Sequence, residues 1–255
     1  MKVCTVREVV SVINEIAPFE LAEEWDNVGL LQGSQCAEVR NILVALDITD
    51  AVAEEAKEKD CQLIVTHHPF MFKPIHRLTD ETREGRLMLK LAAFGIAHIA
   101  AHTNLDAASG GVNDTLIRAA GAVNIRGEGC LRVGDLEPVS FGELCAFVRQ
   151  QLDAQIRTYG DPDRMVHTLG CCSGSGSEWY REAMQLGADC FLTGEVRHNV
   201  ALDALSDGCL MIEAGHYETE RIICPVLSET LQKRLNELQF GVSVFCSDRN
   251  LAERR

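Results

Sequence analysis

The chain has 255 residues, of which 46% are hydrophobic and 24% are charged. This composition excludes a disordered or fibrous protein, and the length favours two medium-sized domains. The formal net charge of −14 argues against a nucleic acid partner, because such binding draws most of its affinity from clustered Lys and Arg.

Apolar periodicity predicts helices that alternate with short strands along the whole chain. The first series is a helix over 7–17, a strand over 41–46, a helix over 50–59, a strand over 62–66, a helix over 83–94 and a strand over 96–101. The second series is a strand over 129–133, a helix over 140–153, a strand over 165–170, a helix over 176–187, a strand over 189–193, a helix over 197–206 and a strand over 209–213. A helix over 218–237 and a strand over 241–246 close the chain. This alternation predicts an α/β fold with mixed sheets flanked by helices.

Three further features of the sequence indicate where in the cell the protein is found. No apolar run approaches the roughly 20 residues of a membrane span, and Arg7 and Glu8 interrupt the apolar pattern at the N-terminus, which suits an amphipathic helix better than a secretory leader. The eleven cysteines form no CxxC pair, which favours reduced thiols. We therefore expect a soluble cytoplasmic protein that binds no membrane.

The two series of elements resemble each other. Residues 52–68 (VAEEAKEKDCQLIVTHH) parallel 179–195 (WYREAMQLGADCFLTGE), and residues 96–106 (IAHIAAHTNLD) parallel 210–220 (LMIEAGHYETE). Two such matches in the same order indicate an internal duplication of about 115–125 residues. We therefore expect two related α/β domains.

The domain limits follow from assigning the strands to two sheets. We place the first domain at residues 1–124 plus 224–255 and the second at 125–223. Ligands of α/β sheets bind outside the carboxyl ends of strands, so a duplication would make the motifs at these ends face each other. The predicted ligand site lies in the cleft between the domains.

The motif THHP ends a predicted strand. Pro69 stops the strand, and in the loop that follows His67 and His68 can turn toward one metal ion or two adjacent ions. Alternatively, one of the two histidines is buried and hydrogen-bonded while the other is solvated.

Two further strands end in a histidine followed four residues later by an acid. These pairs are His102 with Asp106 and His216 with Glu220, and four-residue spacing puts both members on one face of a helix. Single pairs of this kind also occur as ordinary helix-surface pairs. Imidazole together with carboxylate suits zinc, iron, manganese, cobalt or nickel, and fits calcium or magnesium less well.

The motifs EEWDNVGLLQG (23–33), VTHHPFMF (65–72), AHTNLDAASGGVND (101–114), LTGEVRHN (192–199) and AGHYETE (214–220) resemble those of the Nif-three-like dinuclear-metal family, also described as type 2 GTP cyclohydrolase I homologues. The similarity runs nearly end to end. It implies two divalent ions, a cytoplasmic location, a ring-shaped homohexamer and a possible nucleotide substrate. It also implies the metal ligands His67, His68, His102, Asp106, His216 and Glu220.

Three smaller motifs carry further hypotheses. Glu195 and His198 follow the strand that parallels THHP and are candidates for acid–base catalysis, although a solvated helix start explains them too. In CCSGSGSEW a loop opens a helix and is a candidate anion site, formed by Ser173, Gly174, Ser175 and Gly176. It lacks P-loop spacing, and a tight turn with a serine N-cap is the alternative. Asp26 and Asn27 either turn toward the metal site or form an Asx-turn.

These features favour a metal-dependent hydrolase. Six ligands shared by two ions leave positions for water, as in catalytic sites. The family resemblance implies GTP cyclohydrolase chemistry, and phosphoester hydrolysis is a second enzymatic reading. A metal carrier or a regulatory interaction protein is the non-enzymatic alternative.

Overall fold

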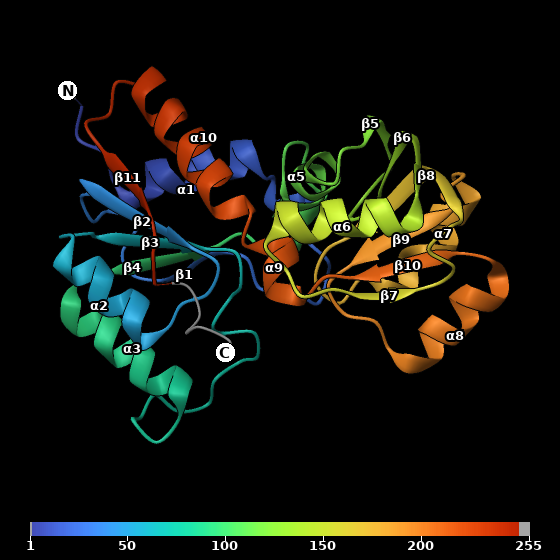
Figure 1. Cartoon of the computed structure of the whole chain (residues 1–255). Coiled ribbons are helices and arrows are strands. Elements are labelled where there is room, and N and C mark those ends of the chain that lie inside the picture. The colour runs from blue at the N-terminus through green and yellow to red at the C-terminus, as the bar shows by residue number, and fades with distance from the viewer. Residues whose placement is uncertain (1, 250–255) are drawn as a thin grey trace. The chain divides into compact units, whose positions relative to one another are not determined.

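The computed structural model describes residues 2–249 and divides them into two compact units. The first unit takes the chain up to Leu105 and again from Cys224, and the second unit is Asp106–Ile223. Each unit is a central sheet with helices on both faces (Figure 1), which confirms the predicted α/β class with two mixed sheets.

The sheet of the first unit has the strand order β1-β4-β3-β2-β11, with β1 antiparallel to β4 and the other neighbours parallel. The strands are β1 (Gly29–Gln32), β2 (Asn41–Ala45), β3 (Leu63–Thr66), β4 (Ala97–Ala100) and β11 (Ser243–Cys246). The helices are α1 (Val6–Ile16), α2 (Asp50–Glu58), α3 (Arg83–Phe94) and α10 (Ile223–Glu237). A short helix, α4 (Thr103–Ala107), follows β4 and leads the chain into the second unit. In Figure 1, α2 and α3 cover one face of this sheet, and α1 and α10 cover the other.

The sheet of the second unit has the order β5-β6-β8-β9-β10-β7, in which β8, β9 and β10 are parallel. The strands are β5 (Val123–Arg126), β6 (Arg132–Ser140), β7 (Arg157–Tyr159), β8 (Met165–Cys172), β9 (Cys190–Thr193) and β10 (Leu210–Glu213). The helices are α5 (Val112–Ala119), α6 (Phe141–Leu152), α7 (Tyr180–Gln185), α8 (His198–Asp207) and α9 (His216–Glu220).

Four strands of each sheet repeat one topology. The order β1-β4-β3-β2 in the first unit corresponds to β7-β10-β9-β8 in the second, and in both cases the first strand alone is antiparallel. The chain passes through the equivalent strands in the same sequence order. This agreement supports the predicted internal duplication and makes β3 and β4 equivalent to β9 and β10.

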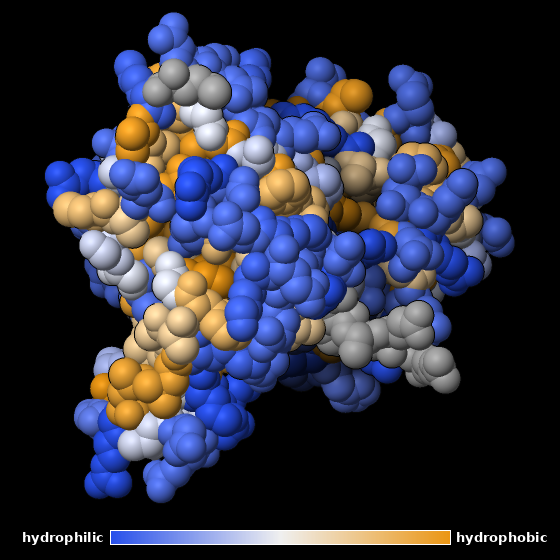
Figure 2. All heavy atoms as spheres, turned by 90° about the vertical axis from the view of Figure 1, so that its left-hand side faces the viewer, coloured by the Kyte–Doolittle hydropathy of each residue, from blue (hydrophilic) through white to orange (hydrophobic). Residues whose placement is uncertain are grey.

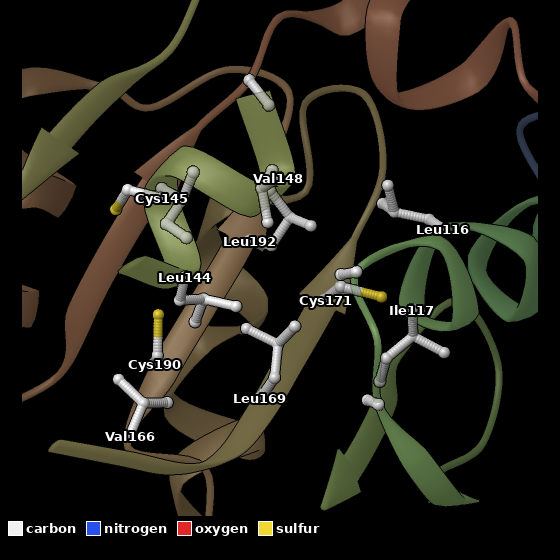
Figure 3. Packing of buried hydrophobic residues seen from close by; sticks show 14 of the residues in the cluster. Leu116, Ile117, Leu144, Cys145, Val148, Val166, Leu169, Cys171, Cys190 and Leu192 are labelled. Carbon is white, nitrogen blue, oxygen red and sulfur yellow. The ribbon is translucent and has the colours of Figure 1, made fainter. Parts of the chain in front are cut away.

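The core of the second unit explains why its strands form. Along β9 the side chains alternate between the two faces: Cys190 and Leu192 pack under α5 and α6, and Phe191 packs with Tyr180 of α7 on the other face. Figure 3 shows the first of these two clusters. A strand with both faces covered reads as a continuous apolar run, which is why β9 was predicted from the sequence.

Several elements differ from the sequence prediction. The short strands β1, β5 and β7 and the helix α5 were not predicted, and β6 is longer than the expected strand over 129–133. The predicted helix over 218–237 is two helices, α9 and α10. The reason is Pro225: its ring would clash with the carbonyl four residues earlier in a continuous helix, whereas the first turn of α10 tolerates it.

The first domain limit also moves. Residues 106–124 pack in the second unit instead of the first, because Leu116 and Ile117 of α5 belong to the buried cluster beneath α6. The chain returns to the first unit at Cys224.

The face of the molecule in Figure 2 is largely hydrophilic, with hydrophobic residues in smaller groups. Among the described residues, no helix is both long and apolar enough to cross a bilayer. The eleven cysteines are free thiols, and most of them are buried.

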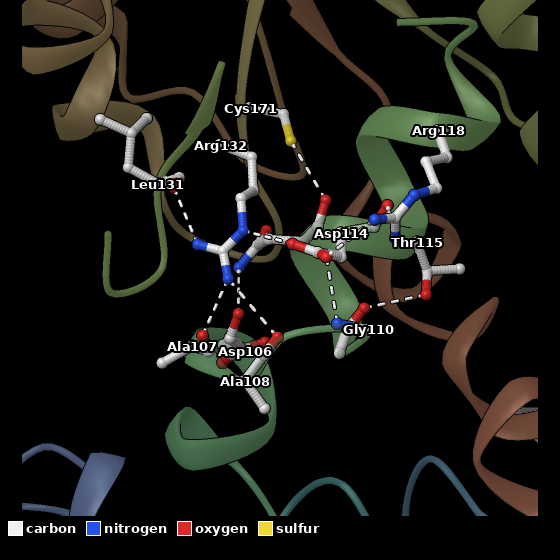
Figure 4. Close-up of polar contacts among 12 residues, drawn as sticks. Asp106, Ala107, Ala108, Gly110, Asp114, Thr115, Arg118, Leu131, Arg132 and Cys171 are labelled. Carbon is white, nitrogen blue, oxygen red and sulfur yellow. Dashed lines mark hydrogen bonds and ion pairs between the residues drawn. The ribbon is translucent and has the colours of Figure 1, made fainter. Parts of the chain in front are cut away.

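One buried ion pair connects α5 to β6 in the second unit. Arg132 donates from Nε to Asp114, and its other nitrogens donate to the carbonyls of Leu131, Ala107 and Ala108 (Figure 4). Burial alone would raise the pKa of Asp114, but the hydrogen bonds from Arg132 and the Gly110 backbone, together with the positive charges of Arg132 and Arg118, lower it overall. The guanidinium thus ties the segment after α4 to the sheet.

We expect Asp114→Ala to destabilise the second unit by about 3–5 kcal/mol, because it leaves the buried Arg132 charge without its partner. The control is Asp135→Ala, which breaks an exposed pair with Arg126 and should cost about 1 kcal/mol or less. Denaturant unfolding followed by Trp179 fluorescence in a Trp25→Phe background measures both. Equal losses would contradict a structural role for the buried pair. Since the folded-state pKa of Asp114 is lowered, its stabilisation is present at neutral pH and disappears as the pH falls through that pKa.

Candidate metal centre

Three histidines of the first unit gather at the carboxyl ends of two neighbouring parallel strands. His67 and His68 follow β3, and His102 follows β4, whose last residues pair as Thr66 with Ala100. One ring nitrogen from each histidine lies within 4.8 Å of the others. The ring centroids are 4.9–5.5 Å apart. The strand register therefore brings together the residues that the sequence suggested in separate motifs.

Each of these rings is oriented through Nδ1 by an oxygen acceptor. The contacts are His67 Nδ1 to Ala101 O at 3.0 Å, His68 Nδ1 to Asp47 Oδ1 at 2.9 Å, and His102 Nδ1 to Asp26 Oδ1 at 2.8 Å. A carbonyl or carboxylate oxygen only accepts, so Nδ1 is the nitrogen that carries the proton. Nε2 is then the nitrogen with a lone pair for a metal, the arrangement found around metal-bound histidines.

Asp26 is the best-anchored of these acceptors. Its side chain is fully buried, and Oδ2 accepts hydrogen bonds from the backbone nitrogen and hydroxyl of Thr103, at 3.0 and 2.5 Å. Burial would raise the pKa of Asp26, but the hydrogen bonds from His102 and Thr103 prevail and hold it well below its ordinary value. The carboxylate is therefore charged and fixed, and of the two readings of Asp26 the structure shows the one in which it turns toward the histidines.

The second unit contains a matching group around His216. His216 Nε2 lies 3.2 Å from Glu220 Oε1, one turn along α9, and His216 Nδ1 lies 3.1 Å from Glu195 Oε1. Glu195 follows β9 at the position equivalent to His68 in the duplicated pattern. The hydrogen bond from Ser175 lowers the pKa of Glu195, and the neighbouring His216 adds to this effect. Glu195 thus orients His216 as Asp26 orients His102.

Asp106 is held by a framework of buried polar groups. Its carbonyl accepts a hydrogen bond from Asn113 Nδ2 at 3.2 Å, and its Oδ1 accepts one from Ser173 Oγ at 3.4 Å. Asn113 Oδ1 in turn accepts from the Ser173 backbone nitrogen at 2.7 Å. Arg132 fixes the two residues that follow Asp106 (Figure 4).

The Gly/Ser loop over 173–176 packs against acidic groups. The backbone nitrogens of Ser173 and Gly174 donate to Asn113 and Thr219, and the hydroxyls of Ser173 and Ser175 donate to Asp106 and Glu195. In this structure the loop supports the carboxylates. Anion binding by Ser173, Gly174, Ser175 and Gly176 stays a prediction.

Gly174 is required where it stands. Its φ is +57°, and a Cβ there would clash with Glu220 Oε1 and press on His216. Only glycine lets the loop pass this close to the two donors.

The catalytic candidates occupy different environments. Glu195 bonds to His216, whereas His198 is exposed at the first position of α8. A role of either in proton transfer stays a prediction.

The sequence analysis did not identify two of the supporting residues, Asp47 and Asn113. Asp47 follows β2, so the rule that polar residues after parallel strands converge would have found it, whereas Asn113 carries no such signal.

The donor sets fit borderline divalent ions. The first unit supplies three imidazoles, and the second supplies one imidazole and the carboxylates of Asp106 and Glu220. Nitrogen and carboxylate donors suit zinc, iron, manganese, cobalt and nickel.

The fold and these donor sets define a duplicated α/β protein with candidate metal-binding side chains at its strand ends. A family model described as Duf34/NIF3 (NGG1p interacting factor 3) matches residues 4–251, and the chain belongs to this family.

Relatives of known sequence and a solved structure support this family assignment. The chain is 34% identical over 258 residues to a Clostridium acetobutylicum protein named GTP cyclohydrolase 1 type 2 homolog, covering 96% of each. It is 33% identical over 230 residues to the Helicobacter pylori protein named GTP cyclohydrolase 1 type 2, covering 89% of this chain and 91% of that one. The crystal structure of Staphylococcus aureus protein SA1388 matches with a TM-score of 0.94 at 26% identity, over 99% of both chains. The resemblance stated from the motifs is confirmed.

Replacing Asp26 by Asn should weaken metal binding about 10–100-fold, because the anionic acceptor that orients His102 is lost. Glu24→Gln, an exposed change two residues away, is the control and should leave affinity unchanged. Competition with a chromogenic chelator measures both. Unchanged affinity in Asp26→Asn would show that the acceptor does not tune the site.

Gly174→Ala should lower metal content through the displacement of Glu220. Gly187→Ala is the matched control, because Gly187 also has a positive φ, +94°, but has open space around it. Each substitution carries a backbone cost of about 1 kcal/mol or more. Thermal unfolding measures the backbone cost in both variants, and elemental mass spectrometry measures their metal content. Similar stability losses with reduced metal content only in Gly174→Ala would support the close approach of Gly174 to Glu220. Equal metal content in the two variants would refute it.

Proposed function

We propose that His67, His68, His102, Asp106, His216 and Glu220 together hold two divalent ions, and that the protein is a metal-dependent hydrolase of the type 2 GTP cyclohydrolase class. The observation that carries the proposal is the orientation of four imidazoles: His67, His68, His102 and His216 each contact an oxygen acceptor through Nδ1. Surface histidines have no need of such uniform support, whereas metal ligands do.

The open coordination expected of this ligand set favours catalysis. Six protein ligands for two ions amount to about three each, and a site with three protein ligands keeps positions for water or substrate. When bound, two ions lower the pKa of a water molecule toward neutrality and stabilise the charge that develops in its attack. The donor types suit zinc, iron, manganese, cobalt and nickel, and the proposal does not choose among these ions.

The side chains of the chain have distinct roles in this proposal. Asp26, Asp47 and Glu195 hold the Nδ1 protons of His102, His68 and His216, so that the ligand nitrogens keep their lone pairs. Glu220, whose side chain is almost fully buried on α9, would supply a carboxylate to the centre. Glu195 and His198 remain the candidates for moving a proton.

GTP is the first substrate to test, because the Helicobacter pylori relative is named GTP cyclohydrolase 1 type 2. In GTP cyclohydrolase chemistry one water adds to C8 of the purine and opens the imidazole ring to a formamide, and a second water hydrolyses the formamide and releases formate. Phosphoester hydrolysis is the second reaction that a two-metal site of this kind supports. The homohexamer implied by the resemblance is also a proposal, and sedimentation velocity tests it.

The decisive experiment loads the protein with zinc, iron or manganese, counts the metal per chain, and measures formate from GTP and phosphate from phosphoesters. We expect about two ions per chain and metal-dependent formate release. His67→Ala and Glu220→Gln should each lower metal content and reduce the rate about tenfold or more. His167→Ala, an exposed histidine paired with Asp189, is the control and should change neither.

Three outcomes discriminate among the alternatives. Fewer than about one ion per chain after reconstitution contradicts the dinuclear centre. Phosphate release without formate selects the phosphoesterase reading. Full metal loading without turnover of any substrate favours the metal carrier or regulatory protein.

A further inference from the structure

Two exposed aromatic side chains border the histidine cluster of the first unit. Trp25 is 59% exposed and Phe72 is 44% exposed, although both are large apolar residues. Their ring centroids lie 5.6 Å apart, with the planes inclined at 55°. The centroids of Trp25 and Phe72 lie 6.3 and 6.2 Å from that of His102, which meets both rings edge-on.

The two rings are carried by loops that are joined to each other and to the histidines. Asn27 Nδ2 donates to the carbonyl of Met71 at 2.6 Å, which connects the loop of Trp25 to the loop of Phe72. Asp26, next to Trp25, is the buried carboxylate that holds His102 and Thr103. Single exposed apolar residues are ordinary on protein surfaces. A fixed pair of rings beside a cluster of metal-binding side chains is not explained that way.

The faces of these rings suit one kind of ligand. Aromatic rings pair best in offset-stacked or edge-to-face geometry, with centroids 4.5–7 Å apart. A planar heteroaromatic ring stacked on one of two inclined rings meets the other edge-on. Nucleobases use such stacking on exposed aromatic side chains, without needing base-specific hydrogen bonds.

We propose that Trp25 and Phe72 form an aromatic subsite that stacks the nucleobase of the substrate and holds it beside His102. This inference rests on the proposed function, because the stacked ring belongs to the substrate of the same centre. The subsite predicts a substrate preference: the protein should bind compounds with a planar heteroaromatic ring more tightly than sugar phosphates.

Trp25 provides a direct readout of this subsite. The chain has two tryptophans, so Trp179→Phe leaves Trp25 as the only one. In this background we expect saturable fluorescence quenching of the zinc-loaded protein by GTP and by guanosine, and none by ribose 5-phosphate. Binding is thus measured without any turnover.

Substitutions at Phe72 test the stacking itself. Phe72→Ala should raise the Kd for GTP about tenfold, and Phe72→Leu, which keeps apolar bulk without a ring face, should also weaken binding. Phe147→Ala is the matched control, because Phe147 is 41% exposed on α6 in the second unit. It should change the Kd less than about twofold. Metal content should stay the same in all three variants.

The proposal is wrong if GTP fails to quench Trp25, if ribose 5-phosphate quenches it equally, or if Phe72→Ala behaves as Phe147→Ala. Concentration-dependent self-association that protects Trp25, with no response to GTP, would identify the pair as a contact between copies. The subsite and the proposed function fail separately: quenching without turnover refutes the hydrolase alone, whereas turnover with a KM unaffected by Phe72→Ala refutes the subsite alone.

Discussion

A histidine binds a divalent cation through one ring nitrogen only when the proton resides on the other, and in this chain oxygen acceptors hold that proton on Nδ1. Asp26 shows how strongly the fold enforces the arrangement. Its carboxylate is buried and charged, and it satisfies His102 and Thr103 at once. Removal of such an acceptor leaves the imidazole without a preferred tautomer or orientation, so the geometry of the histidine cluster depends on residues outside the cluster.

The parallel sheets explain why these acceptors are available. Parallel strands end at one edge, and the segments that leave β2, β3 and β4 carry Asp47, His67 and His102 to that edge. The same edge in the second unit carries Glu195 after β9 and His216 after β10. The two units therefore share one topology but present different donor groups at the ends of their strands. These are imidazoles in the first unit and mainly carboxylates in the second.

Much of this arrangement was accessible from the sequence. The buried strands β3, β4, β9 and β10 are short apolar runs, and their polar termini were identified with them. The edge strands β1, β5 and β7 were missed because almost none of their residues is fully buried, so they lack the continuous buried runs that mark the central strands. Helix α5 was missed because buried Asn113 and Asp114 interrupt its apolar face, and each is satisfied by contacts distant in sequence. Pro225 was the signal that could have divided α9 from α10.

The supporting residues were harder to predict than the candidate metal ligands. A ligand can be recognised by its type and spacing, whereas an orienting residue is defined by which ring it reaches across the fold. Asp26 lies 76 residues from His102, and Asp47 lies 21 residues from His68. Only the strand register makes these pairs neighbours.

The most direct test of the account is the tautomer of the four histidines in the metal-loaded protein, measured by long-range nitrogen–proton NMR of the imidazole rings. The account predicts that His67, His68, His102 and His216 all keep a proton on Nδ1 and bind the metal through Nε2. Binding through Nδ1 at any of them, or ring signals that do not change when metal is added, would contradict it.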